Sequence, residues 1–300
     1  MPRASIIIAT HNRPNLLPRA VESAQAAGSD LEVVVVDDAS TDETANVCRA
    51  LARIKYLRVE RNQRVAGARN VGLVASTGDY LSFLDDDDTR LPGSLDLQID
   101  KLERNPEAAL VYGQALYADD DGQPAREFYP RQCPEGDIFW QLLAQNFIPC
   151  GSAVFRRSAI ARVGLLDDGT AGIDDWDQWI RIAELSPIIA VHQPVVTWRR
   201  SNPRSAQGTS DAATLVSLSA RKFKNTWMKL PRAAAAPRRL RREAWRGFSD
   251  NMMEHALWQS ARSAGAGKPL QPLRNLLVLP QLDTRAVARV AGRRLVGRSK

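Results

Sequence analysis

The amino-acid sequence predicts an α/β fold: a mostly parallel sheet flanked by helices and followed by a basic helical region. Short apolar runs rich in β-branched residues, which suit buried strands, alternate with stretches of the period and length of single helices. Strands that alternate with single helices form right-handed βαβ units and hence a parallel sheet. Polar clusters follow several of these runs, at the sheet edge where such folds bind ligands. The sequence therefore predicts a ligand site at the carboxyl ends of the strands.

The first part of the chain is expected to alternate strictly between strand and helix. Strands are predicted at residues 5–9, 31–36, 54–59 and 80–84. Helices are predicted over about 16–27, 43–52, 66–75 and 92–105. The second of these helices is expected to start with a capping box, in which Ser40 accepts from the amide of Glu43 and Glu43 reaches back.

The second part of the body has fewer helices. Strands are expected at residues 108–112, 150–157 and 195–199, with an Asp-Gly hairpin turn at 119–122. A short acidic turn at 173–175 is expected to lead into an amphipathic helix. Basic helices are then predicted over 215–230, 237–260 and 283–296.

Charge divides the chain into two parts. Residues 211–300 hold 19 Lys and Arg against 5 Asp and Glu, a net charge of +14, whereas residues 1–210 carry −7. We therefore expect an acidic body at 1–210 and a basic helical extension at 211–300. Such an extension indicates a polyanionic partner. Because the sequence has no nucleic-acid recognition motif, we expect an anionic membrane and no nucleic acid. The pattern of 283–296 suits a helix on anionic lipid, or equally a docked helix with a solvated basic face.

Composition and apolar run lengths favour a cytoplasmic protein. The chain has 300 residues, 44% of them hydrophobic, which is enough for a sizeable core. No stretch reaches the roughly 18 apolar residues of a membrane span, and the first strand follows the N-terminus without a secretory signal. Cys48, Cys133 and Cys150 lack metal-ligand spacing and indicate ordinary thiols in a reducing compartment. The expected location is the cytoplasm, with peripheral contact at the inner face of the membrane.

Four consecutive carboxylates, Asp85 to Asp88, follow the strand at 80–84. Two like charges about 4 Å apart repel by about 4 kcal/mol at an effective dielectric near 20, so such a run on a rigid strand end favours a cation among the carboxylates. The alternative is a solvated acidic loop that leads into the next helix. Residues 10–13 and the pair Asp37 and Asp38 are predicted at the same edge, which favours a divalent cation.

A second acidic cluster, residues 174–177, lies beside Trp176 and Trp179. Partial desolvation by the indoles would keep Asp175 basic enough to accept a hydroxyl proton. Helix capping by Asp174 or Asp175 explains the same residues, and the two roles are compatible. Arg69, at a Gly-containing helix start, is either a phosphate contact or a solvated side chain.

These motifs resemble the family 2 nucleotide-sugar glycosyltransferases with the GT-A fold. The matching residues, in the family's order, are 5–13, 35–42, 68–72, 78–80, 83–88, 91–92, 164–167 and 174–181. The resemblance covers about residues 4–205 and implies a nucleotide-sugar half at about 1–110 and an acceptor half at about 111–210.

The resemblance also implies a reaction: an inverting, metal-dependent transfer of a sugar from a nucleotide diphosphate donor to an acceptor hydroxyl. The acceptor would be a glycan or a lipid-linked molecule of surface polysaccharide or glycoconjugate synthesis. Asp175 would be the general base, and Asp87 would bind Mn²⁺ or Mg²⁺. Donor-binding candidates are Ala9, Thr10, Asn12, Arg13, Asp38, Arg69, Asp85 and Asp86, and further candidates, for the acceptor among other roles, are Asp174, Trp176 and Arg199.

The sequence departs from the family pattern at two positions. Asp174 stands where Glu is usual, and Ser201 or Asn202 stands where many relatives carry His. Two other functions remain as alternatives. One is a haloacid-dehalogenase-like phosphatase with Asp85 as nucleophile. The other is a non-catalytic nucleotide-binding or membrane-adaptor protein.

Overall fold

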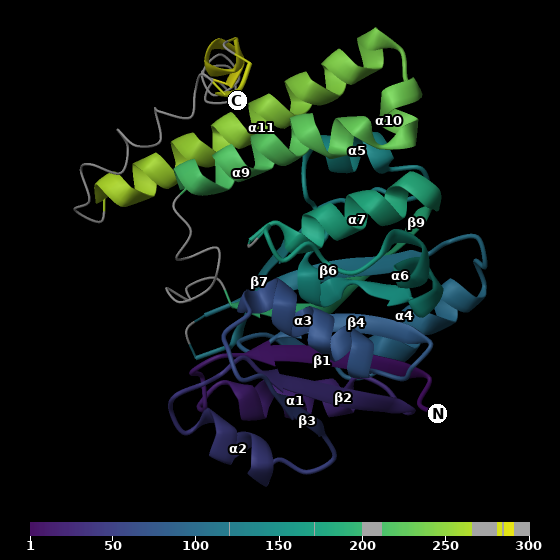
Figure 1. The fold of residues 1–300 in the computed structure, drawn as a ribbon, viewed down its shortest axis with the longest axis vertical. Coiled ribbons are helices and arrows are strands. Elements are labelled where there is room, and N and C mark those ends of the chain that lie inside the picture. Colours follow the sequence, from purple (N-terminus) through teal and green to yellow (C-terminus); the bar gives the residue numbers. More distant parts are fainter. Residues whose placement is uncertain (120, 171, 200–211, 266–280, 284, 291–300) are drawn as a thin grey trace. The chain divides into compact units, whose positions relative to one another are not determined.

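The computed structural model describes the chain except residues 120, 171, 200–211, 266–280, 284 and 291–300 (Figure 1). The chain divides into two compact units. The sheet unit comprises Met1–Ile138 and Phe147–Arg204, and the helical unit comprises Phe139–Asn146 and Ser205–Lys300. Phe139–Asn146 thus clusters with the helical unit, and the predicted division into a body at 1–210 and an extension at 211–300 stays a prediction.

The sheet unit is built on one nine-stranded sheet in the order β3-β2-β1-β4-β8-β6-β9-β5, with β7 paired to β6. Its strands are β1 Ala4–Thr10, β2 Leu31–Asp37, β3 Lys55–Arg58, β4 Tyr80–Asp85, β5 Thr89–Arg90, β6 Leu110–Ala118, β7 Pro124–Tyr129, β8 Val154–Arg156 and β9 Ile188–Arg199. Strands β1 to β4 pair in parallel, as predicted, whereas β8 runs antiparallel to both β4 and β6.

Helices cover both faces of the parallel strands. They are α1 Leu17–Ala26, α2 Thr44–Ala50, α3 Arg64–Ala75, α4 Ser94–Glu103, α6 Arg157–Val163 and α7 Asp174–Leu185. Alternate strand residues such as Ile6, Ile8 and Val35 share a buried cluster with α1 and α4. The intervening side chains of Ile7 and Val36 face α3. Both faces are apolar, which explains why the parallel strands read as continuous β-branched runs.

The strand register fixes the edge that the sequence predicts as the site. Thr10 is paired with Asp37 across β1 and β2, and Ala9 is paired with Asp85 across β1 and β4. The carboxyl ends of these three strands therefore lie side by side. The structure thus brings residues from three distant parts of the chain to one edge.

Several local predictions were wrong. The Ser40 hydroxyl accepts a hydrogen bond from the backbone amide of Asn12 instead of capping α2. At the start of α2, the Asp42 carboxylate accepts from the amide of Thr44. The expected strand at 150–157 begins as a single 3₁₀ turn, η1 (Cys150–Ser152), and only Val154–Arg156 pair as β8. The expected hairpin turn is confirmed, since the amide of Gly122 donates to the carbonyl of Asp119 at 2.9 Å.

The helical unit contains α5 Phe139–Ala144, α9 Ala212–Asn225, η2 Trp227–Lys229, α10 Pro231–Ala235 and α11 Arg238–Gly265. Its core includes Phe223, Trp227 and Phe248, all nearly inaccessible. In the described part of 283–296, Ala286 and Val290 are also buried. None of the helices in the described part of the chain has the length and apolarity to cross a membrane.

Gly72 of α3 allows that helix to lie close to β1. A Cβ at Gly72 would lie 2.3 Å from Ile7 Cγ2 and 3.3 Å from Val36 Cγ2. We expect Gly72→Ala to destabilise the protein by about 1–2 kcal/mol, because overpacking costs about 1–3 kcal/mol and the better helix propensity of Ala returns up to about 1 kcal/mol. Urea unfolding measures this change. Val74→Ala, at an exposed position of the same helix, is the control and should stay within about 0.5 kcal/mol of the wild type. A fully stable Gly72→Ala protein would show that α3 can move away from the sheet.

Candidate functional site

The acidic run at the end of β4 is held by groups from β1 and the loop after it. Thr10 Oγ1 donates to Asp86 Oδ2 at 2.7 Å, and Arg13 Nη1 donates to Asp86 Oδ1 at 2.6 Å. The same Arg13 atom lies 3.6 Å from Asp87 Oδ2. Burial raises the pKa of Asp86 to about 6, although Arg13 and Thr10 favour its charged form. The loop after β1 therefore fixes Asp86 and partly neutralises Asp87.

Arg69 links the end of β4 to the start of α7. Its Nη2 donates to Asp85 Oδ1 at 2.5 Å, and its Nη1 donates to Asp174 Oδ2 at 2.7 Å. The Arg69 side chain is 6% exposed, Asp174 is 3% exposed and Asp85 is 41% exposed, so only Asp85 of the three presents a large open surface. The Arg69 guanidinium also lies 5.2 Å from the ring centroid of Phe83. The side chain of Arg69, on α3, therefore connects the two acidic clusters that the sequence predicts.

Asp175 is next to this bridge, in the first turn of α7. One of its carboxylate oxygens accepts the backbone amide of Trp176 at 2.6 Å. Burial, and then the negative charge of Asp174, raise the pKa of Asp175 to about 7, while Arg69 acts in the opposite direction. The sequence predicts an acidic turn before this helix, but α7 begins at Asp174, so most of that turn is part of the helix. A carboxylate that titrates near neutrality is suited to accepting a proton from a hydroxyl group.

Asp88, the last acid of the run, is tied to the end of β9. Its Oδ1 accepts the backbone amide of Arg199 at 2.9 Å. Burial and the charges of Asp85 and Asp87 raise the pKa of Asp88 well above its usual value. The Arg199 side chain was predicted as a candidate acceptor contact, but the contact that the structure shows comes from its backbone. Residues Ser201 and Asn202, at the position of the family His, lie outside the described residues.

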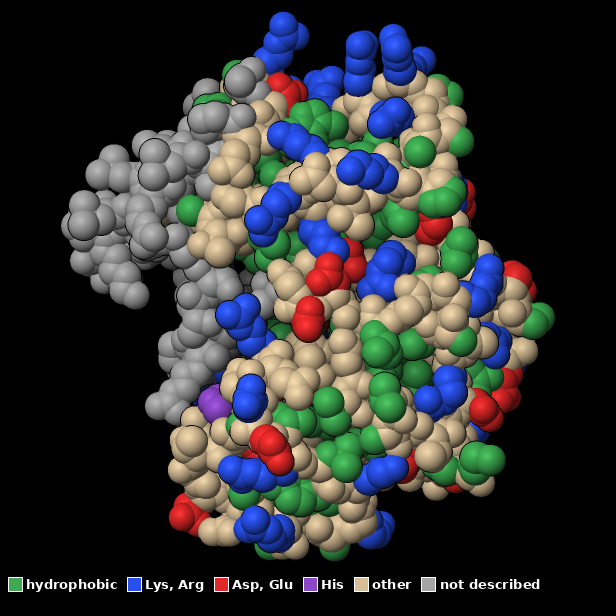
Figure 2. All heavy atoms as spheres, viewed as in Figure 1, with side chains coloured by type: hydrophobic (Ala, Val, Ile, Leu, Met, Phe, Trp, Pro, Cys, Tyr) green, Lys and Arg blue, Asp and Glu red, His purple; other side chains and the backbone are tan. Residues whose placement is uncertain are grey.

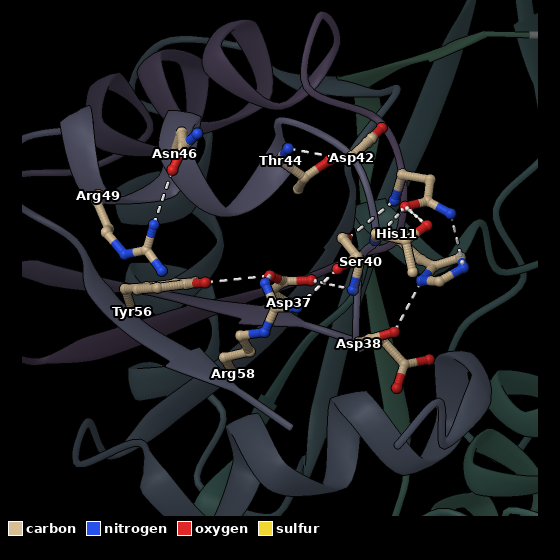
Figure 3. A network of polar contacts seen from close by, with 12 residues as sticks. His11, Asp37, Asp38, Ser40, Asp42, Thr44, Asn46, Arg49, Tyr56 and Arg58 are labelled. Atoms are coloured by element: carbon tan, nitrogen blue, oxygen red, sulfur yellow. Dashed lines mark hydrogen bonds and ion pairs between the residues drawn. The ribbon is translucent and has the colours of Figure 1, made fainter. Parts of the chain in front are cut away.

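Asp37 and Asp38 at the end of β2 have different surroundings (Figure 3). Asp37 is fully buried, and its carboxylate accepts from Tyr56, Arg58 and the amide of Ser40. The Asp38 carboxylate points away from this network, and its Oδ1 accepts the amide of Gln63 at 2.6 Å. Burial raises the pKa of Asp38. Asp37 therefore shapes the loop, whereas Asp38 faces the start of α3.

Other predicted residues support this edge. Asn12 has a left-handed backbone with φ of 55°, and its Oδ1 accepts the amide of Thr41 at 2.8 Å. Asn12 thereby joins the loops after β1 and β2. The Trp176 side chain, offered as a candidate acceptor contact, is buried in the protein core. Ala9 lies on β1 at the register position of Asp85.

Two residues of the site were missed from the sequence. Cys150, in η1, has Arg69 and Asp175 as electrostatic neighbours, and burial together with the nearby acids raises the pKa of its thiol well above the usual value. Asp88 belongs to the acidic run, but the family resemblance assigns it no role. The place of Asp88 in the acidic run indicates that it lies at the site, whereas nothing in the sequence spacing of Cys150 indicates this.

Comparison with known proteins identifies the family of the chain. The model of the family "Glycosyl transferase family 2" matches residues 5–164. A GalNAc(5)-diNAcBac-PP-undecaprenol beta-1,3-glucosyltransferase of Campylobacter jejuni is 39% identical over 134 residues, which are 43% of this chain and 42% of the relative. The succinoglycan biosynthesis protein ExoO of Rhizobium meliloti is 35% identical over 137 residues, 43% of this chain and 37% of the relative. These alignments span less than half of either relative.

A solved structure shares the fold over most of the chain. TarS 1-349 of S. aureus, in complex with UDP-GlcNAc, superposes with a TM-score of 0.67 at 13% identity, and the match covers 95% of this chain and 83% of TarS 1-349. The predicted GT-A fold is therefore confirmed. Since the family model matches more than half of the residues, the chain belongs to glycosyl transferase family 2, a family of transferase enzymes.

Proposed function

We propose that this chain transfers a sugar from a nucleotide diphosphate donor to an acceptor hydroxyl with inversion at the anomeric carbon. The observation that carries the proposal is the bridge formed by Arg69 between Asp85 and Asp174, which links the end of β4 to the helix that bears Asp175. A donor bound at the strand ends would thus lie next to a carboxylate that titrates near pH 7.

Asp175 is the general base in this proposal. In one displacement the acceptor oxygen attacks the anomeric carbon, its proton passes to the Asp175 carboxylate, and the nucleoside diphosphate leaves from the opposite face. Desolvation keeps Asp175 basic, and Asp174 adds to this effect. Arg69 holds Asp174 and so positions the first turn of α7.

Donor binding is assigned to the loops after β1 and β2. Thr10, Asn12 and Asp38 would contact the base and ribose, with Ala9 and Arg13 beside them. Asp85 and Asp86 would contact the ribose or metal-bound water. Arg13 and Arg69 already bind carboxylates, so their part in donor binding is to hold Asp86 and Asp85 in place.

The proposal assigns a divalent cation to the end of β4. The carboxylates of Asp85 to Asp88, Asp174 and Asp175 outnumber the guanidinium groups of Arg13 and Arg69 that neutralise them. Among the described residues, no group of three or more His, Cys, Asp or Glu side chains is arranged to hold a metal ion by itself. Asp87 would therefore hold Mn²⁺ or Mg²⁺ together with phosphate oxygens and water, as is usual for Mg²⁺. When bound, the cation would offset charge on the departing diphosphate.

The acceptor is assigned to surface polysaccharide or glycoconjugate synthesis, as a glycan or a lipid-linked molecule. The support is the names of the relatives, one a transferase of a PP-undecaprenol acceptor and one a succinoglycan biosynthesis protein. A lipid-linked acceptor would place the chain in the cytoplasm at the inner face of a membrane. The phosphatase alternative loses support because Asp85, its nucleophile, is ion-paired to Arg69 and falls within the family match.

Calorimetric titration with nucleoside diphosphates, with and without Mn²⁺, tests donor and metal binding together. We expect one nucleotide to bind at least about tenfold more tightly with Mn²⁺, which corresponds to about 1.4 kcal/mol. Asp87→Asn should remove this gain. The control Asp168→Asn, at an exposed position, should keep it. Equal and negligible binding of every nucleotide in both conditions would remove the proposal.

A further inference from the structure

The helical unit carries a basic and aromatic hollow that the proposed transfer does not use. A hollow of about 380 Å³ lies between α9, η2 and the first turns of α11. It is lined by Phe223, Lys224, Met228, Arg238, Arg241, Arg242 and Trp245. A second hollow, lined by Arg239, Arg242, Glu243 and Arg246, shares Arg242 with it. We call this surface the α11 basic surface.

Positive charge dominates the α11 basic surface. Glu243 is the one acid among its lining residues, and it is paired with Arg239 at 2.9 Å. Among the described residues, no carboxylate partner is found for Arg238, Arg241 or Arg242, which are all exposed. Figure 2 shows Lys and Arg side chains spread over these helices. Uncompensated arginines that converge on a hollow are expected to attract phosphate groups.

The aromatic residues of the hollow favour a lipid surface over a nucleic acid. Trp245 is stacked on Phe248, with 5.5 Å between the ring centroids. Lys224 Nζ lies over the Trp245 ring, 4.6 Å from its centroid. Phe223 lies 5.1 Å from the same ring. Single-stranded nucleic acids are bound by stacking bases on open aromatic faces. The Trp245 ring is already in contact with Phe223, Phe248 and Lys224, which argues against stacking of a base on it.

The predicted basic helix near the C-terminus is less available for this role. Arg289 is bound to Asp250 at 2.5 Å and to Asp283 at 2.9 Å, and the apolar side chains of Ala286 and Val290 are buried. In the described part of 283–296, the charge of Arg289 is therefore compensated and two apolar side chains are packed, as in a docked helix.

We propose that the α11 basic surface binds the phosphate headgroups of an anionic phospholipid membrane, with Arg238, Arg241 and Arg242 as the main contacts. The α11 basic surface would be the part of the chain that contacts the membrane. The proposal depends on the proposed function only in that a lipid-linked acceptor would require such a contact. Its test contains neither donor nor acceptor, so failure of the test leaves the proposed transfer intact.

Vesicle co-sedimentation tests the proposal. The full chain is mixed with vesicles of phosphatidylcholine alone, or of phosphatidylcholine and phosphatidylglycerol. We expect binding only to the anionic vesicles. The triple variant Arg238→Gln, Arg241→Gln, Arg242→Gln should partition at least about tenfold less, because each cation near an anionic surface adds to the attraction. The matched control Arg49→Gln, Arg104→Gln, Arg162→Gln removes the same charge from exposed positions of the sheet unit. It should keep most of the binding.

Three results would overturn the proposal. They are equal losses in the triple variant and its control, equal binding of the wild type to both kinds of vesicle, and binding of an RNA oligonucleotide without binding of anionic vesicles. The triple variant with Lys in place of each Arg keeps the charge and should restore most of the partition. Unchanged unfolding midpoints for the variants would exclude misfolding as the cause of a loss.

Discussion

Replacing Asp175 by Asn is expected to lower turnover by about 100-fold or more while donor affinity stays within about twofold, as loss of a general base should. The substitution keeps the size of the side chain and its bond to the amide of Trp176 but removes the group that accepts the proton. Initial rates with excess donor and acceptor measure turnover, and titration with the nucleoside diphosphate measures affinity. Asp168→Asn is the matched control at an exposed position and should retain full turnover.

The pH profile provides a second readout of the same residue. Because the pKa of Asp175 is raised to about 7, we expect the rate to rise with pH and to reach half its plateau near pH 7. Asp174→Asn removes a neighbouring negative charge, so the midpoint should move to lower pH. Full turnover of Asp175→Asn, or a profile that is flat through neutrality in the wild type, would place the base elsewhere.

The parallel half of the fold could be predicted because each of its strands is recognisable from its own apolar sequence. A strand covered on both faces must be apolar throughout, and the runs at Ile6–Ile8 and Val33–Val36 are fully buried. Once the βαβ order is known, the carboxyl ends must share an edge, so the grouping of Thr10, Asp37 and Asp85 followed from topology.

The details of the site could not be predicted in the same way, because they depend on tertiary contacts between distant residues. Arg69 was visible as a cation at a helix start, but its partner Asp174 is 105 positions away. The segment Phe139–Asn146 has an ordinary apolar pattern, and nothing in it indicates that it packs with α11 rather than with the sheet. The predicted Ser40 capping box was wrong for a related reason. The Ser40 hydroxyl accepts from the backbone amide of the distant Asn12, whereas local spacing predicts that it accepts from an amide of α2.

Replacing Arg69 by Met should produce the largest loss of stability of any substitution considered. Arg69 is buried between Asp85 and Asp174, and its removal leaves buried negative charge without a cation. Breaking a buried ion pair from one side typically costs about 3–5 kcal/mol, because the remaining charge is neither solvated nor paired. Met keeps most of the buried volume, so charge is the main change. Urea unfolding at pH 8 measures the loss, and Arg104→Met, at an exposed position, should stay within about 0.5 kcal/mol.

The pH dependence of this loss separates charge from packing. Arg69 lowers the pKa of Asp175, so its removal should raise that pKa further above the unfolded value. A carboxyl group with a raised pKa binds protons more tightly in the folded state, and the free energy of unfolding therefore falls as pH rises from the unfolded pKa to the folded one. The deficit of Arg69→Met should consequently be smaller at pH 5 than at pH 8. A deficit of the same size at both values would mean that the lost contacts of the Arg69 side chain, rather than the unpaired carboxylates of Asp85, Asp174 and Asp175, destabilise the variant.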